Sequence, residues 1–298
     1  MSAQPTFSAA VETPAGIHSR RVRFDWEATP LHWVPGDSQT THTINVLHLL
    51  LPAGERWFVQ VYKQALHLVR DERLLDDVKG FMAQESWHSR AHASVLDHLA
   101  AQGIDSRPYT RDVEWLFNVL LGDAPLGMRR MPRWFKRRWL LRRLAIIAAI
   151  EHFTAVLGVW ILDAQALDRA AADATMMDLL RWHGAEEVEH RHVAFDLFKH
   201  VGGSYLNGVI AMLVVAPVML WLWFRGVRFF MRADPTVTAK PSWRAFFRAG
   251  RRGLIPPTGM LFGAVPRFMR RDYHPSHEGS TERALAYLAV SPAASAYR

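Results

Sequence analysis

The sequence of 298 residues contains no cysteine. This absence excludes disulfide bonds, metal sites built from thiolates and catalysis by a cysteine nucleophile, and it fits a reducing compartment. Residues 1–30 include several charged side chains and lack a continuous apolar run, so we expect no secretory signal. Long runs in which apolar and polar residues alternate, as in β-strands, are also missing. The last of these absences, with the helical spacing described next, predicts an all-α protein.

Apolar residues recur at helical spacing in five stretches, and half of all residues are hydrophobic, which is enough for a sizeable core. The predicted helices cover about residues 52–69, 71–101, 133–167, 172–201 and 205–231. Short elements are expected at 111–121 and 281–290. We divide the chain into an irregular arm (1–43), a metal-binding helical bundle (44–203), an apolar helix (204–232) and an irregular, basic C-terminal segment (233–298).

Residues 182–192, WHGAEEVEHRH, concentrate three histidines and three glutamates in about three helical turns. At about 100° per residue, His183, Glu187 and His190 fall on the apolar side of this helix. The remaining ionisable residues are predicted to be edge or surface charge: Glu186, Glu189 and His192. Burying a carboxylate without a partner is costly, so Glu187 is expected to face a cation, for which a metal ion is the favoured candidate.

The same projection places ionisable residues inside the apolar stripes of the other three bundle helices. Glu55 lies on the first helix, Glu85 and His88 on the second, and Glu151 on the third. One glutamate from each of two helices and a Glu-x-x-His pair from each of the other two is the constellation of ferritin-like di-iron and di-manganese carboxylate proteins. Carboxylates bridge two hard cations there, and imidazoles complete the coordination. The predicted ligands are Glu55, Glu85, His88, Glu151, Glu187 and His190, with His183 as a seventh.

Several of these assignments have structural alternatives, including coincident charges satisfied by buried salt bridges. Glu55 follows a Pro-Ala-Gly stretch and can simply complement a helix dipole. His183 can be a core histidine beside the ligands, and His92 is expected outside the coordination sphere. His152 points away from its apolar stripe and is assigned to the surface. The sequence DYHPSHE at 272–278 lies in a Pro-rich loop and is not expected to bind metal.

Four blocks, PAGERWF, FMAQESWHSRAH, IEHFTA and WHGAEEVEHRHVAFD, resemble the bacterial family described as predicted metal-dependent hydrolases, over about residues 20–278. The ligand pattern is also similar to the p-aminobenzoate N-oxygenase group of ferritin-like enzymes, which use seven protein ligands including an extra histidine on the last helix. This resemblance implies that His183 is the seventh ligand. We expect two iron ions as cofactor, with manganese and zinc as alternatives.

The fifth helix contains twenty uncharged residues, YLNGVIAMLVVAPVMLWLWF (205–224), which span about 30 Å, close to the hydrocarbon thickness of a bilayer. Trp221, Trp223 and the following arginines are typical of an interfacial belt. Basic residues are interleaved with Trp and Phe at 129–143, 224–232 and 246–253, and the net charge is +8. Beside the apolar run they favour an anionic membrane surface over nucleic acid.

The sequence allows more than one arrangement of the fifth helix. Basic runs flank it on both sides, and Pro217 can bend it, so a span and a monotopic contact are both compatible with the sequence. A helix buried in the bundle or in a homodimer interface is the alternative. We expect the protein at the cytoplasmic side of the inner membrane, peripheral or integral.

The favoured function is a di-iron enzyme that uses dioxygen to oxidise a hydrophobic small molecule or lipid, because mixed nitrogen and oxygen ligation favours redox iron over magnesium. The alternative is a hydrolase in which two metal ions lower the pKa of a bridging water and polarise an ester or phosphoester. A non-catalytic metal-binding protein is the third interpretation.

Overall fold

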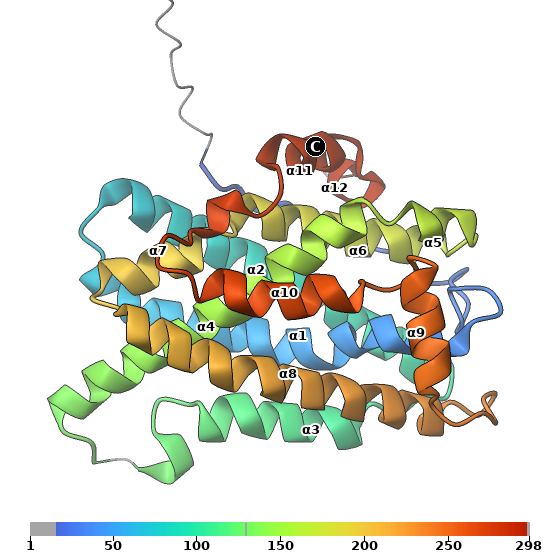
Figure 1. The fold of residues 1–298 in the computed structure, drawn as a ribbon, viewed down its shortest axis with the longest axis horizontal. Helices are drawn as coiled ribbons and strands as arrows, with labels where there is room; N and C mark the ends of the chain where they lie inside the picture. The colour runs from blue at the N-terminus through green and yellow to red at the C-terminus, as the bar shows by residue number, and fades with distance from the viewer. Residues whose placement is uncertain (1–15, 129, 297–298) are drawn as a thin grey trace, which may run out of the picture.

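The structure is a computed structural model that describes residues 16–128 and 130–296 (Figure 1). The described residues contain helices and no β-strand, which confirms the all-α class. The helices α1 (Ser38–Ala65), α2 (Glu72–Ala101), α4 (Arg133–Leu162) and α6 (Ala174–His190) pack against one another, and α8 (Tyr205–Ala233) packs along α1 and α4. The shorter helices are α3 (Arg107–Trp115), α5 (Gln165–Arg169), α7 (Val193–His200), α9 (Trp243–Arg251), α10 (Thr258–Phe268), α11 (Thr281–Val290) and α12 (Pro292–Ser295). Single turns of 3-10 or π helix occupy Leu66–Leu68, Leu116–Leu120, Pro125–Gly127 and Pro275–His277.

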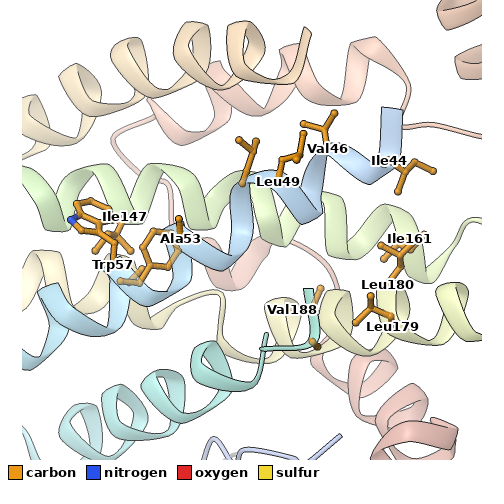
Figure 2. Close-up of a cluster of buried hydrophobic side chains, with 14 of the residues drawn as sticks. Ile44, Val46, Leu49, Ala53, Trp57, Ile147, Ile161, Leu179, Leu180 and Val188 are labelled. Atoms are coloured by element: carbon orange, nitrogen blue, oxygen red, sulfur yellow. The ribbon is translucent and has the colours of Figure 1, made fainter. Parts of the chain in front are cut away.

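The apolar stripes of α1, α4 and α6 contribute to one buried cluster; Figure 2 shows Trp57 and Ile147 at one end of it and Ile161 and Leu180 at the other. Helices α4 and α6 come into backbone contact at a pair of glycines, Gly158 and Gly184. A Cβ atom on Gly158 would lie 2.4 Å from the carbonyl oxygen of Gly184, so a larger residue there would push the two helices apart. This close crossing lies within two helical turns of the glutamates that these helices carry.

The first helix begins earlier than the sequence indicated. α1 starts at Ser38, where the Asp37 side chain accepts a hydrogen bond from the backbone N–H of Thr40, so the expected arm boundary at residue 43 falls inside the helix. Pro52 lies within α1 and not at its start, because the mostly apolar, buried residues before it extend the helix by more than three turns. Residues 1–15 lie outside the described residues. They belong to the predicted arm and form half of the stretch 1–30, in which no secretory signal is expected.

Three other predictions of helix extent need correction. The third and fourth predicted helices are each divided: α4 ends at Leu162 before the short α5, and α6 ends at His190 before α7. The segment after α8, expected to be irregular apart from residues 281–290, also contains the helices α9 and α10. Prolines and glycines flank these short helices and hide their period. The helices expected at 71–101, 205–231 and 281–290 are confirmed within two residues at each end.

Candidate metal centre

Seven ionisable side chains from α1, α2, α4 and α6 converge in the core. They form two groups, one of Glu55, His88 and His183, and one of Glu85, Glu151, Glu187 and His190. In each group, one nitrogen or oxygen atom per residue lies within 4.8 Å of the others. All seven residues are at most 5% exposed. The seven residues selected from the sequence as ligands are therefore brought together.

Glu187 joins the two groups. Its Oε1 lies 2.7 Å from Nε2 of His183, and its Oε2 lies 3.3 Å from Nε2 of His190. The three residues share one face of α6 because they are spaced four and three residues apart. Glu85 and His88 share a face of α2 for the same reason. A carboxylate placed between two groups of ligand atoms can bridge two cations.

Many polar atoms of these groups have no hydrogen-bond partner among the described residues. They are both carboxylate oxygens of Glu55, Glu85 and Glu151, and Nδ1 of His88. Buried polar atoms are nearly always paired, and leaving one unpaired costs about 1–3 kcal/mol or more if it is charged. The seven residues thus fit a pair of cations, since four carboxylates balance the charge of two divalent ions.

The surroundings of His190 support the same conclusion. Its Nε2 lies 3.2 Å from Glu151, 3.3 Å from Glu187 and 3.4 Å from Glu85. One N–H cannot serve three carboxylates. Neighbouring atoms bound about 2.1 Å from the same ion are about 3 Å apart, so this spacing suits a set of metal ligands.

Burial and mutual repulsion shift the acidity of the glutamates. Burial, followed by repulsion from Glu187, raises the pKa of Glu85 and of Glu151 to about 8. Burial and the other glutamates also hold the pKa of Glu55 well above its ordinary value. Burial alone would raise the pKa of Glu187 too, but His190 and His183 hold it well below its usual range. Without cations, the cluster therefore resists full ionisation.

Each of the three histidines has one ring nitrogen toward the cluster and the other on an outer partner. The pairs are His88 Nε2 with Glu186 Oε2 at 2.9 Å, His183 Nδ1 with His92 Nε2 at 2.8 Å, and His190 Nδ1 with Gln84 Oε1 at 2.8 Å. Histidines that bind metals almost always donate their second N–H to such a partner, which fixes the tautomer and the ring orientation. The outer contacts therefore prepare all three inner nitrogens to accept a metal ion.

The assignment of Glu186 and Glu189 to edge or surface charge was wrong. Glu186 is fully buried, and its Oε1 accepts a hydrogen bond from Arg20 at 2.9 Å. Arg20 also donates to Glu189, which accepts a further bond from Gln84. The helical projection of α6 cannot show this, because the covering segment comes from the irregular N-terminal region. No sequence signal identified Arg20 as the partner of Glu186 and Glu189.

The contact between His183 and His92 continues to a third histidine that the sequence analysis missed. His92 Nδ1 lies 2.7 Å from Nδ1 of His48, which is fully buried. If His183 turns Nε2 to the cluster, its Nδ1–H donates to His92, and His92 then donates to His48. His48 lies two turns before Glu55 on the same face of α1, so the correct helix start would have revealed it.

Three histidines that were not predicted to bind metal, His152, His192 and His274, lie outside the cluster. The surface assignment of His152 was wrong: the residue is buried, because α10 and the segment after it cover this side of α4. Its Nδ1 lies 2.6 Å from the Tyr273 hydroxyl, and its Nε2 lies 2.9 Å from the Ala264 carbonyl oxygen. The His192 side chain is 31% exposed. In the loop 272–278, His274 contacts Asp196 instead of the cluster.

A further group with metal-ligand chemistry, His32, His42 and Asp234, lies where the N-terminal segment meets α1 and the end of α8. Both histidine Nε2 atoms lie 2.7 Å from the same Asp234 oxygen. The other oxygen of Asp234 accepts hydrogen bonds from Thr236. This carboxylate is therefore saturated by protein donors, unlike those of Glu55, Glu85 and Glu151.

An all-α chain that buries two adjoining groups of glutamates and histidines falls in the class of helical metal-binding proteins. A family model described as predicted metal-dependent hydrolase matches residues 18–279. This match covers most of the chain, so the chain belongs to that family, and the resemblance seen in the sequence is confirmed. Neither the curated proteins nor the solved structures contain a match to it.

Proposed function

We propose that the protein is a dinuclear metal enzyme, with two iron ions as the preferred cofactor, that uses dioxygen to oxidise a hydrophobic substrate. The observation that carries this proposal is the pair of adjoining, deeply buried ligand groups joined by Glu187. Three imidazoles among the donors favour iron, manganese or zinc over magnesium, which prefers oxygen ligands only. Manganese and zinc are the alternatives to iron.

The residues divide between two ions. Glu55, His88 and His183 would hold one ion, and Glu85, Glu151, Glu187 and His190 would hold the other. When bound, the ions supply the redox chemistry with dioxygen that no side chain of this cluster provides. Glu186, His92 and Gln84 keep the three histidines in the ligating tautomer through the hydrogen bonds described above.

Aromatic rings close the cluster from water. Phe81 packs against His190 with ring centres 4.5 Å apart, Tyr62 stacks on Phe81 at 4.8 Å, and Trp182 meets His88 at 5.1 Å. The Tyr62 hydroxyl is buried without a hydrogen-bond partner. Burial, then repulsion from Glu151, Glu85 and Glu187, holds its pKa well above the ordinary value, so Tyr62 keeps its proton and its hydroxyl remains a hydrogen-bond donor.

The burial of the ligands favours oxidation over hydrolysis. The most exposed of the seven residues, His183, is only 5% exposed. Moving a polar ester or a charged phosphoester from water into such a buried site costs more desolvation free energy than moving dioxygen and a hydrophobic substrate there. Hydrolysis by a metal-bound water of lowered pKa is the second candidate, and the description of the family favours it.

Metal analysis combined with an oxygen electrode tests the proposal. The purified protein is expected to contain two iron ions per chain, and the anaerobically reduced protein should consume dioxygen with a change in its optical spectrum. A Glu151→Gln variant, which lacks one ligand carboxylate, should lose both responses. Bound zinc, no oxygen consumption and hydrolysis of p-nitrophenyl esters or phosphoesters would establish the second candidate and refute oxidation.

A further inference from the structure

One side of α8 exposes a continuous apolar stripe. Six of its side chains are each more than half exposed: Leu206, Ile210, Leu213, Val214, Leu220 and Trp221. The opposite side of the helix, with Met212 and Leu222, is buried against the bundle. The stripe extends over fifteen residue steps, or about 22 Å. Monomeric soluble proteins rarely expose contiguous apolar surface of this kind, and large patches mark sites of contact with other proteins, membranes or ligands.

The stripe continues onto the neighbouring helix α9. The rings of Phe224 and Trp243 stack with centres 5.1 Å apart, and Trp243 also stacks on Phe247. Trp243 is 58% exposed and Phe247 49% exposed. We call the exposed apolar side chains of α8, together with Trp243 and Phe247, the α8 face; Figure 1 shows both helices on the viewer's side. Tryptophan is enriched at the level of lipid headgroups.

The excess positive charge of the protein lies in the same segment. Residues 204–271 hold eleven of the 36 lysines and arginines but only one of the 28 aspartates and glutamates. The formal net charge of this segment is therefore +10, and that of the rest of the chain is −2. The single acidic residue, Asp234, is buried and occupied by His32 and His42. The segment thus complements an acidic surface.

Three arginines line an open hollow of about 430 Å³ between α3 and the C-terminal half of α8. Arg225 lies over the ring of Trp221 and also forms an ion pair with Asp112. Arg228 lies over the ring of Phe224, and in the described part of the chain neither it nor Arg232 forms an ion pair. Free guanidinium groups beside exposed aromatic rings suit the phosphate of a lipid headgroup.

We propose that the α8 face docks the protein in the plane of a bilayer that contains acidic phospholipids, with its apolar stripe in the outer acyl region and Arg228 and Arg232 on headgroup phosphates. A second copy of the chain does not suit this face, because two segments of charge +10 would meet. Nucleic acid would leave the aliphatic stripe exposed to water. The combination of apolar side chains and arginines is that of a helix that lies in the membrane interface.

The packing of α3 argues against a transmembrane span. α4 and α8 are both long and apolar enough to cross a bilayer, but the apolar stretch of α4 is mostly buried in the protein. Tyr109 of α3 donates a hydrogen bond to the Leu222 carbonyl, and Asp112 pairs with Arg225. A spanning α8 would draw the charged helix α3 toward the hydrocarbon region, which is costly. A monotopic contact leaves α3 at the surface.

Flotation of the purified full-length protein with lipid vesicles tests the docking. Binding to phosphatidylcholine vesicles should strengthen when phosphatidylglycerol is added, and high salt should weaken it only to the level seen without the acidic lipid. Arg228→Ala and Arg232→Ala should each weaken binding to the acidic vesicles about fivefold. Leu213→Asp should weaken binding to both kinds of vesicle. The matched control is Val290→Asp on α11, where the replaced valine is 70% exposed.

The absence of cysteine allows the orientation to be measured directly. Single Leu206→Cys, Leu213→Cys and Leu220→Cys variants can each carry an environment-sensitive fluorophore, with depth read by quenchers placed along the lipid chains. The three positions are seven residues apart, about 10 Å along the helix. In-plane docking predicts the same shallow depth for all three, whereas a span predicts that Leu213→Cys lies deepest.

Three results would overturn the proposal. The first is a lack of vesicle binding by the wild-type protein, or binding that Leu213→Asp and Val290→Asp weaken equally. The second is a depth profile with Leu213→Cys at the bilayer centre. The third is a stable homodimer in light scattering that Leu213→Asp dissociates, because the α8 face would then be a contact between two copies. None of these measurements depends on the metal content or the catalytic activity.

Discussion

Replacing Glu151 by glutamine should affect the metal-loaded and metal-free protein in opposite directions. Glu151 is buried, both of its carboxylate oxygens lack hydrogen-bond partners, and its pKa is raised to about 8, chiefly by burial. With two divalent ions bound, Glu151→Gln leaves one positive charge uncompensated in the core. Breaking a buried charge pair costs about 3–5 kcal/mol. The affinity for the second ion should therefore fall by roughly 10²–10⁴-fold.

In the metal-free protein, Glu151→Gln should be stabilising. A raised pKa means that the folded state binds the proton more tightly than the unfolded state does. The stability linked to this proton is complete below the unfolded pKa of about 4.5 and is lost as the pH rises through about 8. Each pH unit in this window costs about 1.4 kcal/mol. Glutamine carries no such charge. The metal-free Glu151→Gln protein should therefore exceed the wild-type protein in free energy of unfolding by an amount that grows from about pH 5 to pH 8.

Elemental analysis and thermal unfolding after chelation at pH 8 measure these two effects. The Glu114→Gln variant is the control, because the Glu114 side chain is 50% exposed on α3 and lies outside the cluster. A Glu151→Gln protein that keeps two ions per chain and melts at a lower temperature when metal-free would refute the reasoning. Glu151 would then stabilise the fold through its ion pair with His190 and would not be a ligand.

Three further predictions concern the same cluster. His190→Ala should lower the metal content, whereas His192→Ala should leave it nearly unchanged, since only His190 faces the carboxylates; equal losses in elemental analysis would contradict the orientation of α6. His92→Phe should weaken metal affinity about 10–100-fold in chelator competition, because it removes the acceptor for the Nδ1–H of His183. His92→Gln retains an acceptor and should keep most of the affinity. Equal effects of the two substitutions would argue against this hydrogen bond. Metal loading near pH 7 should release protons, measurable with an indicator dye, because metal-free Glu85 and Glu151 have pKa values of about 8; loading without release would show that they are already ionised.

The sequence predicted the composition of the cluster because helical geometry decides which residues share a face. Glu187 and His190 interrupt an apolar stripe, and a charged residue in such a position must meet other polar groups once the helix is buried. The convergence of four such helices needs only that their apolar stripes pack together. Residues that share a face of one helix can be recognised without knowledge of the loops, so Glu55 was placed on the inner face although the predicted start of α1 was wrong. The wrong start nevertheless left a helix-dipole role open for Glu55 and hid His48.

Features that depend on covering segments escaped the sequence analysis. His152 points away from the apolar stripe of α4, but α10 returns from more than a hundred residues later to bury it. Glu186 is buried by Arg20 from the N-terminal region in the same way. The composition of α8 fits a core helix and a membrane helix equally, and only its packing distinguishes its buried side from its exposed side. Helical periodicity contains no information about such distant contacts.

The α8 face and the metal cluster should be separable by mutation, although α8 packs on the helices that carry Glu55 and Glu151. Leu213 and Val214 are more than half exposed, so aspartates at both positions stay hydrated and cost little folding free energy. The Leu213→Asp/Val214→Asp protein should therefore leave membranes while remaining folded and loaded with metal. Glu151→Gln should show the reverse, with normal vesicle binding and reduced metal content. Flotation and elemental analysis of both variants provide the comparison. If the double aspartate variant unfolds and loses its metal, α8 is an internal support of the bundle in solution, and its outer side is not a docking surface.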